Sequence, residues 1–153
     1  MINFCVSLTT IPSRIKQVGI TIDSLIAQTK KPQKIFLNIP HRYERFPDQF
    51  ISTEYLEKFS NIETLEIVRC DDFGPGTKLL GSINKLEKYS HVVLVDDDHI
   101  YQKDMFEIFF NEALKNPHSA YSFCVYDIED LKVGQGADGF MINIKYLKNI
   151  LLF

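Results

Sequence analysis

The residues of this sequence best suited to chemistry are three adjacent carboxylates, Asp96, Asp97 and Asp98, which follow the apolar run 92–95. A run of β-branched and leucine residues of this kind is typical of a strand buried on both faces. Because like charges repel, three carboxylates at the end of such a strand are unfavourable unless something positive binds there. Divalent Mg²⁺ or Mn²⁺ prefers carboxylate oxygens and is the natural partner. A solvated acidic turn before a helix is the alternative interpretation.

The spacing of the three carboxylates separates them into two sets. Side chains alternate across an extended chain, so Asp96 and Asp98 point to one side and can meet one ligand, whereas Asp97 faces away. The histidines show no spacing typical of a metal site, and we expect each of them to lie at the surface or in a loop: His41, His91, His99 and His118.

Two further segments place polar and positively charged residues directly after an apolar run. Residues 9–14 (TTIPSR) follow the run 2–8, and residues 70–78 (CDDFGPGTK) follow the run 63–68. In the second segment the glycines permit close backbone approach, and Lys78 with the helix N-terminus presents positive potential to an anion. Its spacing does not match the phosphate-binding loop GxxxxGK[ST]. Each segment on its own is explained at least as well by a helix cap or a plain turn.

A fourth segment, residues 134–139 (GQGADG), places glycines on both sides of Asp138. Glycines in this position suit a carboxylate that must approach a ligand closely, and they suit a plain tight turn equally well. The residue pattern leaves both interpretations open.

Alternating strands and helices are predicted to position these residues. In an open parallel sheet, ligands bind in the crevice at the carboxyl ends of the strands, where the segments described above are expected to lie. The alternation predicts βαβ units and an α/β fold with an open, mostly parallel central sheet and helices on both faces. We expect strands over 2–8, 34–39, 63–68, 91–95 and 121–126, and helices over 12–26 and 53–59, after caps at Thr77 and Asp104, and over 145–153.

The composition is that of an ordinary globular chain, and we expect one domain over residues 1–153. Hydrophobic residues make up 45% and charged residues 24%, which excludes disordered and fibrous architectures. The formal net charge is −3, which argues against a nucleic-acid partner. We expect no membrane span and no secretory signal. The three cysteines are expected to be free thiols in a reducing compartment, which predicts a cytoplasmic location: Cys5, Cys70 and Cys124.

In combination, these motifs resemble the nucleotide-sugar glycosyltransferases of the GT-A fold. They are similar in particular to family-2-type enzymes and to small glycosyltransferase domains encoded by large DNA viruses of algae. The resemblance extends over roughly residues 3–147, and the order of the motifs is more specific than the aspartate motif alone. The segments that carry it are, in chain order, VSLTTIPSR, SLIAQTKKP, QKIFLNIP, DDFGPGTK and VVLVDDDHIY.

The resemblance implies transfer of a sugar, of hexosyltransferase type, from a nucleoside diphosphate sugar to a hydroxyl group of a glycan or other acceptor. It further implies that Mn²⁺ or Mg²⁺ is required, that Asp98 binds the metal directly, and that Asp96 contacts the metal or the ribose. Asp138 is the implied catalytic base of an inverting reaction. The implied nucleotide-sugar pocket is completed by Thr9, Thr10, Arg14, Asp71, Asp72, Lys78 and Asp97.

Two other functions stay open at this point. One is a metal-dependent module that binds a nucleotide sugar without transferring it. The other is a phosphatase of the haloacid dehalogenase type, which places its DxD motif on the first strand and follows it with Thr or Val, whereas here His99 follows Asp98. Because the glycosyltransferase domains in question are commonly longer than this chain, we also expect truncation on the C-terminal, acceptor-binding side.

Overall fold

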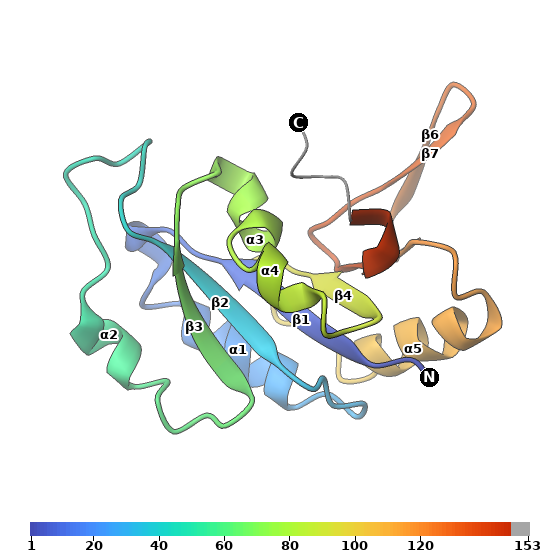
Figure 1. The fold of residues 1–153 in the computed structure, drawn as a ribbon, viewed down its shortest axis with the longest axis horizontal. Helices are drawn as coiled ribbons and strands as arrows, with labels where there is room; N and C mark the ends of the chain where they lie inside the picture. The colour runs from blue at the N-terminus through green and yellow to red at the C-terminus, as the bar shows by residue number, and fades with distance from the viewer. Residues whose placement is uncertain (148–153) are drawn as a thin grey trace.

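The computed structural model describes residues 1–147, which are built around a six-stranded sheet in the order β3-β2-β1-β4-β8-β5 (Figure 1). The four strands on one side of the sheet are parallel to one another, and the last two pairings are antiparallel. The strands of the sheet are β1 (Phe4–Thr9), β2 (Ile35–Pro40), β3 (Leu65–Cys70), β4 (His91–Leu94), β5 (Tyr121–Ser122) and β8 (Phe140–Asn143). The predicted α/β class with a mostly parallel sheet is confirmed.

Helices cover both faces of the sheet, because the buried strands are apolar on both sides. From β1, Phe4, Val6 and Leu8 pack in one core with helices α1 (Val18–Ile26) and α5 (Met105–Lys115). Cys5 points to the opposite core, which includes Leu86 of α4 (Ile83–Leu86). Figure 1 shows α3 (Thr77–Leu80) and α4 in front of the sheet and α1 and α5 behind it. The chain also forms the short helix α2 (Thr53–Glu57).

The connection after β1 differs from its prediction because it begins with a tight turn. The connection after β3 contains the turn predicted at residues 74–76 and differs only in the role of Thr77. The helix expected over 12–26 is divided into the 3₁₀ turn η1 (Pro12–Arg14) and α1, with a turn between them. After β3, the 3₁₀ turn η2 (Gly74–Gly76) precedes α3, and Thr77 is the first residue of that helix rather than its cap. Both turns keep a basic side chain close to the carboxyl edge of the sheet.

The last third of the described chain departs furthest from its prediction. The strand expected over 121–126 is wrong: after β5 the chain leaves the sheet, and β6 (Val125–Ile128) pairs with β7 (Leu131–Gly134) in a separate hairpin that projects from the body (Figure 1). β8 was not predicted, and it returns the chain antiparallel to β4. Asp104 precedes α5 but makes no side-chain cap hydrogen bond. The helix expected over 145–153 is a 3₁₀ turn, η3 (Ile144–Leu147), as far as the description reaches; residues 148–153 lie outside it.

No helix within residues 1–147 is both long enough and apolar enough to cross a membrane.

Candidate active site

A cleft of about 410 Å³ lies at the carboxyl ends of the parallel strands. The residues after β1, β2, β3 and β4 all contribute to it, as expected for an open α/β sheet. The predicted site residues that line it are Thr9, Thr10, Arg14, Asp72, Lys78, Asp96, Asp97 and Asp98. We call this cavity the donor cleft, after the nucleotide-sugar donor that the sequence resemblance implies.

Asp97 anchors the acidic turn to the protein interior. It is only 4% exposed, and its carboxylate accepts a hydrogen bond from the Thr10 hydroxyl. Its backbone carbonyl accepts another, of 2.9 Å, from the hydroxyl of Thr21 in α1. Burial raises the pKa of Asp97, and the hydrogen bond from Thr10 together with the charge of Arg14 opposes that rise. Asp97 is held inward while Asp96 and Asp98 are partly exposed, but all three line the donor cleft. The predicted alternation does not apply to them, because β4 ends at Leu94.

The protein's own cations neutralise the acidic turn. Arg14 Nη1 lies 2.6 Å from Asp98 Oδ2 and 3.3 Å from Asp97 Oδ1, and Lys78 Nζ forms an ion pair with Asp96. In the absence of an ion, the three carboxylates are thus balanced in part by the chain itself, because η1 and α3 each supply a positive side chain. Partial burial raises the pKa of Asp98, but the hydrogen bond from His99 and the charge of Arg14 outweigh it and lower the pKa below its ordinary value.

Asp96, Asp98 and His99 form a group that could hold a metal ion. One ligand atom from each of the three lies within 4.8 Å of the others. His99 Nδ1 is 2.9 Å from Asp98 Oδ1, and its ring stacks on Tyr101 with 6.0 Å between the ring centroids. His99 was not predicted as a ligand because the histidines show no spacing typical of a metal site; its position directly after the aspartates was the available signal. Two carboxylates and an imidazole can together bind a divalent cation.

His91 also differs from its prediction. It is 1% exposed in β4, rather than at the surface or in a loop, and burial lowers its pKa.

The turn that presents Lys78 is organised by Asp72. Its Oδ1 accepts a hydrogen bond of 2.8 Å from the backbone N–H of Gly74, and its Oδ2 accepts one of 2.8 Å from the N–H of Glu44. Gly74 has φ +57°, in the left-handed region that favours glycine. Asp71, predicted beside Asp72, is exposed and does not line the donor cleft. Asp71 is thus the one predicted donor residue that the fold leaves outside.

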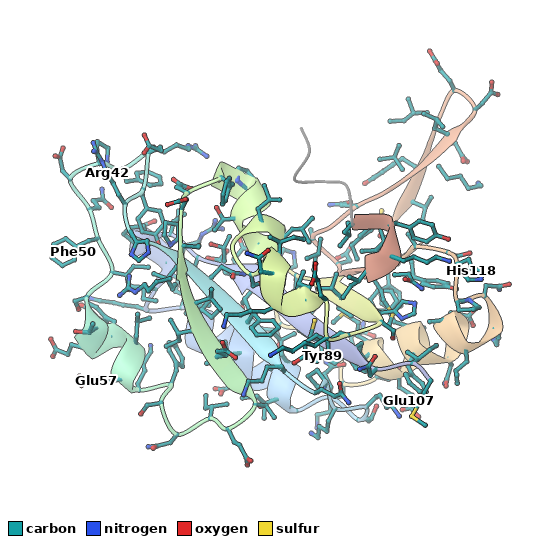
Figure 2. The ribbon with its side chains drawn as sticks, in the orientation of Figure 1. Arg42, Phe50, Glu57, Tyr89, Glu107 and His118 are labelled. Carbon is teal, nitrogen blue, oxygen red and sulfur yellow. The ribbon has the colours of Figure 1, made fainter. Side chains whose placement is uncertain are left out.

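The loop after β2 contributes a wall of the donor cleft that the sequence analysis did not identify. Tyr43 is buried and donates a hydrogen bond of 3.0 Å to the backbone carbonyl of Thr10. Figure 2 shows Arg42 and Phe50 on the same loop at the edge of the molecule. The alternation of polar and aromatic residues in this loop was the only signal in the sequence. The cleft residues of this part of the chain that were missed are Pro40, Tyr43, Arg45 and Phe46.

Asp138 lines a second cavity, of about 250 Å³. His99, the residue that follows Asp98 of the donor cleft, lines this second cavity as well. Gly139 has φ +92°, and a Cβ at this position would lie 3.0 Å from the sulfur of Met105, so any other residue would be strained there. The loop therefore turns sharply after Asp138. The other residues that line this second cavity are Ile100, Tyr101, Gln102, Asp104, Met105 and Phe123.

Tyr101 connects the two cavities through its hydroxyl group. This hydroxyl accepts a hydrogen bond of 2.9 Å from the backbone N–H of Asp96 and donates one of 2.8 Å to the carbonyl of Ala137. Burial raises the pKa of Tyr101, so the hydroxyl keeps its proton at any ordinary pH. The acidic turn and the loop that carries Asp138 are thus held together by one side chain.

Tyr101→Phe is expected to lower the free energy of unfolding by about 1–3 kcal/mol, because an N–H and a carbonyl group lose their shared partner. Urea unfolding followed by circular dichroism measures the loss. Tyr146→Phe is the matched control: it removes an exposed hydrogen bond to the carbonyl of His118 and should change the stability by less than about 0.5 kcal/mol. Equal effects of the two substitutions would contradict the assigned role of Tyr101.

No protein-family model matches the sequence, and no curated protein matches it. Solved structures match in three dimensions. Residues 1–349 of S. aureus TarS align with 99% of this chain and 50% of that chain, at 15% identity and a TM-score of 0.67. The complex of the same protein with UDP-GlcNAc gives a TM-score of 0.69 at 15% identity, over 99% of this chain and 48% of that chain. The mannosyltransferase PcManGT from Pyrobaculum calidifontis, in complex with GDP-Man and Mn²⁺, gives 0.69 at 13% identity over 97% of this chain and 46% of that chain.

This chain has the GT-A glycosyltransferase fold. The fold predicted from the resemblance is confirmed, and the chain spans about half the length of these solved structures. In this GT-A fold, the acidic turn follows the parallel strand β4, and β8 pairs antiparallel with that strand. The loop that carries Asp138 leads directly into β8, so this pairing brings Asp138 back toward the acidic turn.

Proposed function

We propose that this chain is a metal-dependent glycosyltransferase that moves a sugar from a nucleoside diphosphate sugar to an acceptor hydroxyl. The observation that carries the proposal is the donor cleft itself: a metal-type group, Asp96, Asp98 and His99, faces the cations Arg14 and Lys78 in a GT-A fold. Two solved structures with the same fold support the proposal: one is a complex with UDP-GlcNAc, and the other is a complex with GDP-Man and Mn²⁺. Both of those donors carry a six-carbon sugar, which supports a hexosyltransferase.

The possible metal ligands Asp96, Asp98 and His99 fit a divalent metal ion. Asp98 and Asp96 offer carboxylate oxygens toward the cleft, His99 offers an imidazole nitrogen, and the three ligand atoms lie close enough to share one ion. When bound, the metal supplies positive charge that balances the diphosphate. Mn²⁺ is our proposed ion, with Mg²⁺ as the alternative.

Arg14 and Lys78 stabilise the leaving group in this proposal. When the bond between the anomeric carbon and the phosphate oxygen breaks, its electron pair remains on the diphosphate and increases the negative charge there. A guanidinium and an ammonium group that line the same cleft can donate hydrogen bonds to these oxygens. Asp97, Thr10 and Asp72 keep the two turns in place and need not touch the phosphates.

Tyr43, Phe46 and Pro40 give the donor cleft an aromatic and apolar wall, which suits a nucleotide base. Thr9 lies at the end of β1 and donates a hydrogen bond of 2.8 Å to the carbonyl of Asn38, so it ties β1 to β2 beside that wall.

Asp138 is our proposed catalytic base. An acceptor hydroxyl in the second cavity would give its proton to the Asp138 carboxylate while its oxygen forms the new bond to the anomeric carbon. Attack from the side opposite the departing diphosphate inverts that carbon. The position of Asp138 in a cavity that adjoins the acidic turn supports this role.

A thermal-shift screen tests the proposed function directly. Nucleoside diphosphate sugars with Mn²⁺ are expected to stabilise the chain by about 2.7 kcal/mol at a ligand concentration of 100 times Kd. Removal of divalent ions with EDTA should abolish most of this stabilisation. The same protein should release no product from a chromogenic phosphate ester, which separates the proposal from a phosphatase.

If no nucleotide sugar raises the unfolding temperature, the proposed function is wrong. Stabilisation without transfer to any supplied acceptor would instead favour a binding module.

A further inference from the structure

The carboxylates that would hold a metal are already occupied by the chain's own cations. Arg14 Nη1 contacts Asp98 Oδ2 at 2.6 Å, and His99 Nδ1 contacts the second oxygen, Asp98 Oδ1, at 2.9 Å. Lys78 forms an ion pair with Asp96 Oδ1. Both oxygens of the carboxylate assigned to the metal are therefore engaged in the ligand-free chain.

These ion pairs compete with a metal for two reasons. A hydrogen bond from a cation uses one of the two lone pairs of a carboxylate oxygen, so the metal competes for part of the ligand capacity of these groups. In addition, a positive side chain a few ångströms away repels a divalent ion, and at this partly exposed edge of the sheet the repulsion is only moderately screened. The pairs are not locked in the interior, because the side chains of Arg14 and Asp98 are 37% and 42% exposed. The two cations can therefore be displaced.

The same two cations have a second set of partners available once a diphosphate enters. Arg14 and Lys78 both line the donor cleft. The Nε atom of Arg14 is buried and has no hydrogen-bond partner among the described residues, so the guanidinium group retains an unused donor. Arginine binds phosphate oxygens through paired donors, and lysine binds them as a point charge.

We propose that Arg14 and Lys78 are exchangeable counter-ions. Without ligand they neutralise Asp98 and Asp96; when a metal ion and a diphosphate enter together, the carboxylates take the metal and the two cations transfer to phosphate oxygens. The proposal rests on the function proposed above. It implies that the metal and the nucleotide each bind weakly alone and tightly together. A bound metal releases Arg14 and Lys78 for the phosphate oxygens, and a bound diphosphate draws these cations away from the carboxylates that take the metal.

Isothermal titration of Mn²⁺ into the nucleotide-free chain tests this proposal. Arg14→Gln and Lys78→Gln are each expected to bind Mn²⁺ about tenfold more tightly than the wild type, because a competing positive charge is gone. The same variants should bind UDP or GDP about tenfold more weakly at saturating Mn²⁺. Arg14→Lys, which keeps the charge, should retain nearly the wild-type affinity for Mn²⁺.

Lys85→Gln is the control. Lys85 pairs with Glu66 at 2.7 Å outside the donor cleft, so its loss should alter neither affinity. Weaker or unchanged Mn²⁺ binding by both glutamine variants would overturn the proposal, because cations that only support the fold cannot improve metal affinity when removed. If the variants bind Mn²⁺ more tightly but neither UDP nor GDP binds any form of the chain, competition for the carboxylates stands and the proposed glycosyltransferase function fails.

Discussion

Asp98→Ala is expected to abolish metal-dependent donor binding and to lower the rate of sugar transfer by on the order of 10³-fold. Asp98 is the only residue of the described chain whose two carboxylate oxygens contact both Arg14 and His99. Its removal takes away the proposed metal ligand and leaves the guanidinium and imidazole groups without that partner. Titration of UDP and GDP in the presence of Mn²⁺ measures binding, and release of nucleoside diphosphate from a matching donor measures turnover.

Asp71→Ala is the matched control for this prediction. Asp71 belongs to the other acidic pair of the sequence, but it is exposed and outside the donor cleft. We expect its loss to change donor binding and transfer by less than about twofold. If Asp71→Ala proved as damaging as Asp98→Ala, the donor cleft would be assigned to the wrong residues.

Asp138→Asn is expected to leave donor affinity unchanged and to lower transfer by about 10²–10⁴-fold. The amide keeps the size of the side chain but cannot accept the proton of the acceptor hydroxyl. Asp138 lines the second cavity rather than the donor cleft, so the metal and the nucleotide should bind as before. Donor titration and transfer assays on the same preparation separate the two effects.

Asp104→Asn supplies the comparison, because Asp104 is the other carboxylate of the second cavity. It should retain most of the transfer activity. An Asp104 variant that stops transfer while Asp138→Asn remains active would move the catalytic base from the loop before β8 to the start of α5.

The parallel half of the fold could be predicted because short stretches of neighbouring residues indicate each of its strands. Each of β1 to β4 is a short apolar run, and the polar residues after each run mark the edge of the sheet where the cleft forms. The antiparallel half could not be predicted in the same way, since the run 121–126 has strand-forming residues throughout and nothing in it shows that the chain leaves the sheet after Ser122.

The ion pairs of the site could not be predicted from the sequence either, because their partners lie far apart along the chain. Arg14 and Asp98 are 84 positions apart, and only the parallel pairing of β1 with β4 brings the ends of these strands together. The aromatic wall of the donor cleft was missed because Tyr43 and Phe46 lie in a loop without periodicity. Asp71 lies outside the cleft, whereas Asp72, which accepts a hydrogen bond from the N–H of Gly74, lines it; the sequence alone could not distinguish these two neighbours.

The hydroxyl group of Tyr101 has a mechanical consequence. It is bonded on one side to the backbone of Asp96, the residue paired with Lys78, and on the other to the carbonyl that precedes Asp138. A displacement of the Asp96 backbone therefore moves the loop that carries Asp138 as well, unless one of these two hydrogen bonds breaks.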